Sequence, residues 1–258
     1  MTSPKPSHAG RTTPTKPAAD SSPNPITDPP HLPLIAPSIL AADYTRLGEE
    51  CRSALDAGGD LLHYDVMDGH LVPNLALGVD MLASLRASLP DAFFDVHLMI
   101  ERPDLFAEPF AKAGAGHLTF HIESMGGAMA GDEGRARALI DTIHGLGMSA
   151  GIAIDGPTPI ERADALLEHA DLVLIMAIRA GFAGQAFDPA ALDKVRHVRD
   201  RVGQGVRIEV DGGVGPDQAG NLLDAGADVL AAASAVFRVS PDDRMSVITH
   251  MRTPKGGL

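Results

Sequence analysis

Apolar and polar residues follow one repeating order along most of the chain. From Leu34 onward, a short apolar run is followed by a turn and then by a longer amphipathic stretch, and this order recurs to the end. Short apolar runs alternating with helical periodicity are typical of parallel strands joined by crossover helices. Eight such βα units predict an α/β protein, a closed (β/α)8 TIM barrel rather than an open doubly wound sheet.

The predicted elements can be placed by their ends. The strands are expected at Leu34–Leu40, Leu61–Met67, Phe93–Met99, His117–Ile122, Ser149–Ile154, Leu172–Ala177, Val206–Val210 and Asp228–Ala233. The helices are expected at Asp43–Ala57, Val79–Leu89, Leu105–Ala113, Asp132–Leu146, Pro159–His169, Pro189–Val202, Pro216–Ala225 and Pro241–Met251. Gly114 and Gly226 stand between a helix and the next strand, where helix C-caps belong. No Gly-x-Gly-x-x-Gly fingerprint follows an early strand, so the sequence gives little support to a Rossmann fold.

The first 31 residues differ in composition from the rest. They hold eight of the 20 prolines and nine Ser or Thr, with no aromatic residue. Such a segment buries too little apolar surface to offset the entropy of ordering it, so we expect a disordered extension at 1–31 and a barrel domain at 32–258. On this view, deleting Met1–Pro30 would leave the melting temperature and turnover almost unchanged.

Composition narrows the class of protein. A chain of 258 residues with 45% hydrophobic content suits a single barrel with a full core. The net charge of −13 argues against a nucleic-acid partner. The one cysteine, Cys51, excludes an internal disulfide, and no apolar run approaches the ~18 residues of a membrane span. We therefore expect a cytoplasmic protein with no membrane partner.

The stretch Leu61–Asn74 carries the most unusual pattern. If its first half is a strand, His63, Asp65 and Met67 lie two apart and point to one side. Asp68-Gly69 then turns the chain. A strand that ends in a polar triplet under a loop is typical of the catalytic mouth of a parallel barrel. The alternative is an edge strand with one wet face, which would leave the apolar residues between them only half buried.

The other strand ends are also rich in chemistry. They carry Ser38, His97, Met99, His121, Glu123, Met176, Asp211 and Ser234. Two imidazoles and two carboxylates, from His63, His97, Asp65 and Asp211, suit one divalent ion such as Zn²⁺, Fe²⁺, Mn²⁺ or Co²⁺. Spacing alone does not establish this site, because the ligands come from three strands. Each residue could also have a purely structural role. The histidines could be hydrogen-bonded core residues, Asp211 a turn carboxylate, the methionines core filling and Ser38 a helix cap.

Several motifs carry a family resemblance. His-x-Asp-x-Met-Asp-Gly-His-x-Val-Pro-Asn at 63–74 resembles the signature of the ribulose-phosphate 3-epimerases. Ala36–Leu40, Asp95–Met99 and Glu209–Val214 match further motifs of that family in the same order, and the resemblance extends over about Ala36 to Arg252. It implies a metal-dependent enzyme that interconverts D-ribulose 5-phosphate and D-xylulose 5-phosphate through an enediolate. It also implies that the partner is a small ketose phosphate, and we expect a homo-oligomer.

The resemblance assigns roles to individual residues. The four metal ligands would be His63, Asp65, His97 and Asp211, with Asp65 and Asp211 also taking and returning the proton. The substrate would be contacted by Ser38, by His97 and by an apolar floor of Met67, Met99 and Met176. Phosphate would bind at Gly212, Gly213, Ala233 and Ser234, under a lid that includes Gly181, Phe182, Ala183 and Gly184.

The chain departs from the family pattern at two places. The lid reads Arg179-Ala180-Gly181-Phe182-Ala183-Gly184-Gln185 in place of Pro-Gly-Phe-Gly-Gly-Gln after a polar residue, and Ala233 stands where glycine is usual. A Cβ at position 233 would crowd the phosphate or exclude a backbone angle that only glycine tolerates. Arg179 would then either replace the lost contact or remain solvated.

Three other activities compete with the leading prediction. The nearest is 3-epimerisation of a hexulose phosphate such as D-allulose 6-phosphate. A phosphosugar-binding barrel without turnover is a second possibility, motivated by Ala180, Ala183 and Ala233. The third is the decarboxylation carried out by related barrels, which use Asp-x-Lys-x-x-Asp on a strand. Because Asp65-Val66-Met67-Asp68 contains no lysine, that chemistry lacks its acid here.

Overall fold

The sheet of this protein is curled and almost entirely parallel. A computed structural model describes residues 23–126, 132–182 and 184–253. Within these ranges, nine strands follow the spatial order β1-β9-β8-β7-β6-β5-β4-β2-β3, and only the short β3 runs antiparallel, against β2. The strands are β1 (Leu34–Pro37), β2 (Leu62–Asp68), β3 (Leu75–Ala76), β4 (Phe94–Met99), β5 (His117–His121), β6 (Ser149–Ile154), β7 (Leu172–Met176), β8 (Arg207–Asp211) and β9 (Val229–Ala232).

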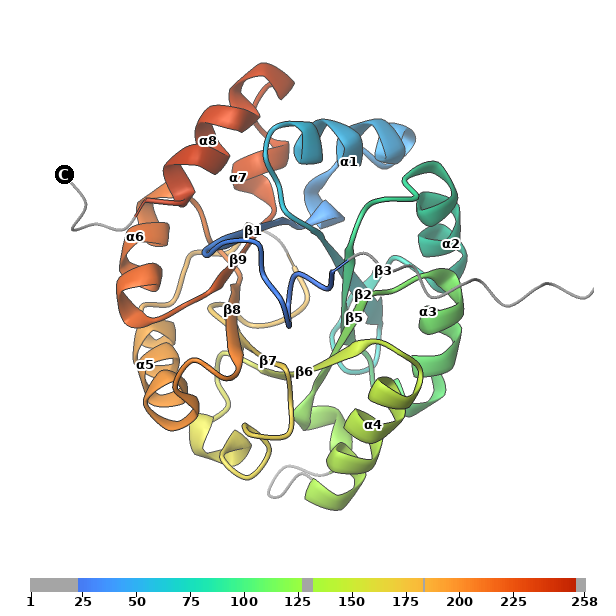
Figure 1. Cartoon of the computed structure of the whole chain (residues 1–258), viewed down its shortest axis with the longest axis vertical. Helices are drawn as coiled ribbons and strands as arrows, with labels where there is room; N and C mark the ends of the chain where they lie inside the picture. Colours follow the sequence, from blue (N-terminus) through green and yellow to red (C-terminus); the bar gives the residue numbers. More distant parts are fainter. Residues whose placement is uncertain (1–22, 127–131, 183, 254–258) are drawn as a thin grey trace, which may run out of the picture.

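The two ends of the parallel sheet meet and close it. Ser38 and His63 form a parallel bridge between the end of β1 and the start of β2. Just before β2, the Asp60 N–H donates to the Ile35 carbonyl at 2.9 Å, and the Asp60 carboxylate accepts from the Ile35 N–H at 2.7 Å. Figure 1 looks along the resulting barrel, with the helices arranged around its strands. The predicted (β/α)8 barrel is confirmed.

The helices surround the strands and bury one face each against them. They are α1 (Leu47–Asp56), α2 (Val79–Ser88), α3 (Ala107–Ala113), α4 (Glu133–Gly145), α5 (Ala190–Val202), α6 (Pro216–Ala225), α7 (Ser234–Phe237) and α8 (Arg244–Met251). Short 3₁₀ helices occur at Ile39–Ala41, Tyr44–Arg46, Pro103–Leu105, Ile122–Met125, Ile160–Ala163 and Pro241–Asp243. Gly114 and Gly226 end α3 and α6 in the left-handed conformation, as predicted. Among the described residues, no helix combines the length and apolarity needed to cross a bilayer.

Alternation along β2 separates the two apolar layers of the molecule. Tyr64 and Val66 pack in the large cluster between strands and helices, whereas Met67 packs with Met99 and Met176 inside the barrel. Because side chains alternate across a strand, His63 and Asp65 share the inner side with Met67. All three are buried, which excludes the wet edge strand considered as an alternative.

The helix predicted over Pro159–His169 is absent as an α-helix. The segment instead makes hydrogen bonds from one residue to the third before it, including Arg162 N–H to Pro159 O at 3.3 Å and Leu166 N–H to Ala163 O at 2.8 Å. Its buried apolar residues are Ile160, Ala163, Leu166 and Leu167. Ile160, Ala163 and Leu166 are spaced by three and so lie on one side of a 3₁₀ turn, which has three residues per turn.

The disorder expected for residues 1–31 is wrong for the part that the structure describes, residues 23–31. The Ile26 side chain is fully buried and joins the apolar cluster inside the barrel, with Leu34 and Leu61. The Asn24 amide donates to Ser149 Oγ at 3.0 Å, at the start of β6. Residues 23–31 therefore pack against the end of the barrel opposite the strand carboxyl ends. They are held there because Ile26, an apolar residue among the prolines, is completely buried. The expected disorder of residues 1–22 lies outside the described residues.

This contact changes the expected effect of truncation. Ile26→Ala should lower the free energy of unfolding by about 2–5 kcal/mol, the usual cost of emptying a buried aliphatic site. Removal of Met1–Pro30 should therefore destabilise the barrel. Denaturant unfolding monitored by circular dichroism measures this, with Met245→Ala as the control because Met245 is 59% exposed. Equal stabilities for the Ile26 variant and wild type would contradict the packing described here.

Candidate active site and metal centre

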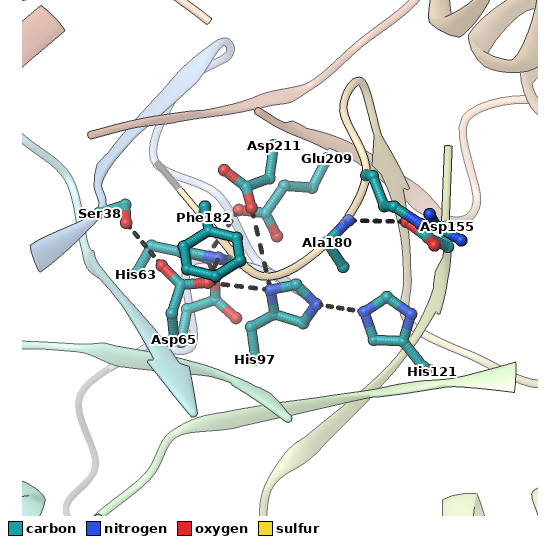
Figure 2. Close-up of polar contacts among 12 residues, drawn as sticks. Ser38, His63, Asp65, His97, His121, Asp155, Ala180, Phe182, Glu209 and Asp211 are labelled. Atoms are coloured by element: carbon teal, nitrogen blue, oxygen red, sulfur yellow. Dashed lines mark hydrogen bonds and ion pairs between the residues drawn. The ribbon is translucent and has the colours of Figure 1, made fainter. Parts of the chain in front are cut away.

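Four side chains from three strands converge inside the barrel near the carboxyl ends of its strands. His63 and Asp65 come from β2, His97 from β4 and Asp211 from β8, and one ligand atom of each lies within 4.8 Å of the others. Asp65 Oδ1 is 3.3 Å from His63 Nε2 and 3.1 Å from His97 Nδ1, while Asp211 Oδ2 is 4.0 Å from His97 Nδ1. Figure 2 shows the four groups facing one another. The structure thus brings together all four predicted ligands.

The donor set fits a divalent cation. Zinc bonds of 2.0–2.2 Å in a tetrahedron place neighbouring ligand atoms about 3.3–3.6 Å apart, close to the separations found here. His63 Nε2 is buried and makes no hydrogen bond, although it lies beside Asp65. A buried nitrogen without a partner is costly, and a cation between these groups would satisfy it. The arrangement is therefore a group that could hold a metal ion.

Two further carboxylates lie behind His63 and are not among the residues expected from the sequence. Asp95 Oδ2 lies 2.6 Å from His63 Nδ1, and Glu209 Oε1 lies 3.2 Å from the same nitrogen. Both side chains are fully buried. A carboxylate that accepts from Nδ1–H leaves Nε2 free as a ligand, which is the arrangement common around metal-binding histidines. Burial and the Asp95 charge raise the pKa of Glu209 to about 8, so Glu209 is largely neutral at pH 7.

A signal for Asp95 and Glu209 was present in the sequence. Asp95 stands two residues before His97, and Glu209 stands two residues before Asp211. In a strand, this spacing places each of them on the same inward side as its partner. The inward side of these strands is therefore polar over two successive positions.

The two candidate catalytic carboxylates differ in acidity. Burial disfavours the charge of Asp65, but His63 and His97 outweigh burial and hold the pKa of Asp65 well below its usual range. Burial, together with the Asp65 charge, raises the pKa of Asp211 to about 7. In the metal-free protein, one carboxylate is thus ionised while the other can carry a proton near neutral pH. Such divergence is what a base and an acid acting together require.

Most of the predicted substrate residues line a single pocket above the four ligands. Asp65 and Asp211 open into it, and the Ser38 hydroxyl donates to Asp65 Oδ2 at 2.6 Å. The other predicted residues that line the pocket are Met67, Met99, Met176, Gly181, Phe182, Gly184, Gly212, Gly213, Ala233 and Ser234. His63 and His97 are fully buried and are not among the lining residues. Ala183 lies outside the described residues.

The loops around the pocket depend on glycine and on long-range hydrogen bonds. Gly212 and Gly213 have φ of +106° and +65°, and a Cβ on Gly212 would lie 2.3 Å from the Ile178 side chain. Only glycine adopts such angles without strain. The Asn74 amide donates to the Gly181 carbonyl at 2.8 Å, so the turn after β2 is tied to the predicted lid.

The two departures from the family pattern have different surroundings. Ala233 has φ −90° and ψ −87°, and this negative φ does not require glycine. Of the two effects expected of a Cβ at position 233, exclusion of a glycine-only backbone angle is therefore wrong, and crowding of the phosphate stays a prediction. Arg179 is exposed and is not among the residues that line the pocket.

Comparisons with known proteins agree with these features. The curated ribulose-phosphate 3-epimerase of Escherichia coli (strain K12) is 44% identical over 223 residues, which cover 85% of this chain and 95% of that protein. The ribulose-phosphate 3-epimerase of Mycobacterium tuberculosis (strain H37Rv) is 43% identical over 227 residues, covering 87% and 93%.

Solved structures show the same fold at low identity. The 3-keto-L-gulonate-6-phosphate decarboxylase of Vibrio cholerae superimposes with a TM-score of 0.64 at 16% identity, covering 86% of this chain and 96% of that one. A 3-hexulose-6-phosphate synthase superimposes with a TM-score of 0.61 at 18% identity, covering 86% and 98%. At this identity the likeness concerns the barrel alone.

Residues 34–237 match the model of a protein family described as "Ribulose-phosphate 3 epimerase family". With relatives above 40% identity over most of its length, the chain belongs to the ribulose-phosphate 3-epimerase family, a family of carbohydrate-phosphate isomerases.

Proposed function

We propose that the protein interconverts D-ribulose 5-phosphate and D-xylulose 5-phosphate by inverting carbon 3. The observation that carries the proposal is the pair of carboxylates, Asp65 and Asp211, which face one pocket from different strands. Epimerisation next to a carbonyl needs a base on one face of the carbon and an acid on the other. The pair supplies both, and the relatives named for this reaction support the choice of substrate.

In the proposed reaction, the two aspartates exchange roles with direction. The ionised carboxylate of Asp65 takes the carbon-3 proton of one epimer, and protonated Asp211 delivers a proton to the opposite face. In the reverse direction Asp211 takes the proton and Asp65 returns it. Ser38 donates to Asp65 Oδ2, which fixes that carboxylate with Oδ1 toward the centre of the four ligands. Positioned acid–base catalysis of this kind contributes roughly 10²–10⁴-fold to the rate.

One divalent cation is proposed as the cofactor, held by His63, Asp65, His97 and Asp211. When bound, it stabilises the negative charge that develops on the substrate oxygens as the proton leaves. The mixed imidazole and carboxylate set suits Zn²⁺, Fe²⁺, Mn²⁺ or Co²⁺ better than Mg²⁺, which prefers oxygen ligands.

The remaining pocket residues are proposed to bind the substrate. Met67, Met99 and Met176 present thioethers and apolar surface below the reacting carbon, where they exclude water. At the other side of the pocket, Gly212, Gly213 and the first turn of α7 at Ser234 offer backbone N–H groups to the phosphate. Gly181, Phe182, Ala183 and Gly184 are proposed to cover the bound substrate as a lid.

The surroundings of Ala233 lead to a prediction at the phosphate end. Ala233→Gly should change KM for ribulose 5-phosphate by less than about threefold, because a φ of −90° already suits alanine. Arg179→Ala should also have a small effect, since Arg179 lies outside the pocket lining. Steady-state kinetics measure both. A roughly tenfold lower KM in Ala233→Gly, the value of one recovered hydrogen bond, would show that the Cβ crowds the phosphate.

Side-by-side assays test the proposed substrate. We expect the metal-loaded protein to convert ribulose 5-phosphate to xylulose 5-phosphate with a higher kcat/KM than it shows toward D-allulose 6-phosphate. A preference for the six-carbon sugar would assign the protein to hexulose phosphates. Absence of turnover with both sugars, at full metal loading, would favour a barrel that binds phosphosugars without converting them.

A further inference from the structure

A chain of hydrogen-bonding groups leads from a proposed metal ligand to a carboxylate outside the ligand set. His97 Nε2 lies 2.9 Å from His121 Nε2, and the ring centroids are 5.0 Å apart with the two ring planes 19° from parallel. His121 Nδ1 lies 3.2 Å from Glu123 Oε2. Figure 2 shows His121 beside His97, on the side away from Asp65. The complete chain is therefore Asp65–His97–His121–Glu123.

The number of protons in this chain has a chemical consequence. Its three links join Asp65 to His97, His97 to His121, and His121 to Glu123. Both ends are carboxylates, which only accept, so each of the three links needs one N–H proton. Two neutral imidazoles supply two. The chain is thus one proton short, and a cation at the Asp65–His97 end removes the deficit by taking the place of one proton.

With a cation on His97 Nδ1, the remaining two protons have one consistent arrangement. His97 Nε2–H donates to His121 Nε2, and His121 Nδ1–H donates to Glu123. Glu123 sets the direction of donation along these hydrogen bonds, because an ionised carboxylate accepts and cannot donate. Burial raises the pKa of Glu123, but hydrogen bonds from His121 and from the Asp155 backbone outweigh burial and lower it to about 2. Glu123 is therefore ionised at neutral pH.

From this geometry we infer that Glu123 is a positioning residue, which acts through His121 to keep the His97 Nδ1 lone pair available to the metal. The inference rests on the proposed metal centre. No atom of Glu123 belongs to the ligand group, and its effect passes through two imidazole rings.

The second oxygen of Glu123 is fixed by the backbone. Glu123 Oε1 accepts from the Asp155 N–H at 3.0 Å. Asp155 and Gly156 lie in the turn after β6. Lys194 Nζ donates to the carbonyls of Asp155 at 3.1 Å and Gly156 at 2.6 Å. The Asp155 carboxylate in turn accepts from the Ala180 N–H at 2.8 Å, at the start of the proposed lid. The Asp155 N–H therefore requires an acceptor oxygen from the side chain at position 123, whether that residue is Glu or Gln.

This constraint makes Glu123→Gln informative. The amide oxygen must face the Asp155 N–H, so the amide NH₂ must face His121 Nδ1 and donate to it. His121 Nε2–H then donates to His97 Nε2, and the His97 proton moves to Nδ1, where it donates to Asp65. All three links are then satisfied by two neutral imidazoles without a cation. The same change that preserves the shape of the side chain therefore opposes metal binding.

Glu123→Ala should have a smaller effect on metal affinity than Glu123→Gln. The Glu123 side chain is 20% exposed, so water can enter the space left by truncation and accept from His121 Nδ1–H. A role limited to packing would produce the opposite order, because alanine removes more contacts than glutamine. The order of the two variants thus separates a positioning role from a structural one.

Cobalt titration of the metal-free proteins tests the inference. Co²⁺ binding is followed by its visible absorption in wild type, Glu123→Gln, Glu123→Ala and a control, Glu161→Gln, which removes an equal charge from an exposed position. We expect Glu123→Gln to weaken Co²⁺ binding by about 10–100-fold, the usual cost of losing a group that orients a metal ligand. Glu123→Ala should weaken it less than Glu123→Gln, and the control by less than about twofold.

The outcomes distinguish this inference from the metal centre itself. Equal affinity in Glu123→Gln and wild type, or weaker binding in Glu123→Ala than in Glu123→Gln, would overturn the role of Glu123 alone. Absence of Co²⁺ binding to wild type would overturn the metal centre and this inference with it. Thermal unfolding of the metal-free proteins establishes folding, and if Glu123→Ala does not fold, the comparison of Glu123→Gln with its control decides.

Discussion

Asp65→Asn and Asp211→Asn should each lower the turnover of ribulose 5-phosphate by roughly 10²–10⁴-fold or more. Asparagine keeps the size of each side chain but cannot take up a proton at neutral pH. Because the reaction needs one group on each face of carbon 3, loss of either blocks epimerisation in both directions. Steady-state assays in both directions measure the effect, with Asp80→Asn as the control at an exposed position on α2.

The deuterium exchange of the single variants separates the two faces. A variant that retains one carboxylate can still exchange the carbon-3 proton of one epimer with solvent, since that half of the reaction needs a single base. We expect the two variants to favour opposite epimers. Metal content must be measured in both, because Asp65 and Asp211 are also proposed ligands. Wild-type turnover in either variant at full metal content would refute the assignment.

Removal of metal should abolish the activity as completely as loss of an aspartate. Dialysis against a chelator is expected to reduce turnover to background, and Zn²⁺, Fe²⁺, Mn²⁺ or Co²⁺ should restore it while Mg²⁺ does not. The same ions should raise the unfolding temperature, because binding at 100 times Kd adds about 2.7 kcal/mol to stability.

His63 and His144 provide a matched pair of variants for the metal prediction. His63→Asn removes a buried ligand and should prevent both the restored activity and the thermal shift. His144→Asn changes a partly exposed histidine that pairs with Asp171 at 2.8 Å, on the helical layer, and should leave both unchanged. Full activity after exhaustive chelation, with no metal detected by elemental analysis, would contradict the proposed cofactor.

The fold could be predicted from sequence because its signals are local and repeated. Strand β6 at Ser149–Ile154 and helix α6 at Pro216–Ala225 have the same bounds in the structure as those expected from the sequence. In both elements, the spacing of apolar residues and the flanking glycine or proline indicate the same bounds. The failure at Pro159–His169 arose because the buried positions Ile160, Ala163 and Leu167 have the spacing of three and four that also suits an α-helix, whereas the segment forms a 3₁₀ turn at Ile160–Ala163. Ile26 was missed because its pocket is built by residues distant in sequence.

The site could be predicted only in part. His63, Asp65, His97 and Asp211 were selected from their strand positions and from the family resemblance, and the structure brings them together. Asp95 and Glu209 could have been found by extending the period of two, one step back along each strand. The link from His121 through Glu123 to Asp155 could not, because it depends on side-chain rotamers at the end of β5 and on the position of a backbone N–H in the turn after β6.

Proton NMR of ribulose 5-phosphate in D₂O with the metal-loaded protein tests the central claim most directly. If Asp65 and Asp211 act on opposite faces of carbon 3, the xylulose 5-phosphate formed should carry solvent deuterium at carbon 3 from the first turnover. One carboxylate takes the proton and the other delivers a solvent-derived one. Formation of xylulose 5-phosphate that retains the original carbon-3 proton, or the absence of any xylulose 5-phosphate, would contradict the two-aspartate account.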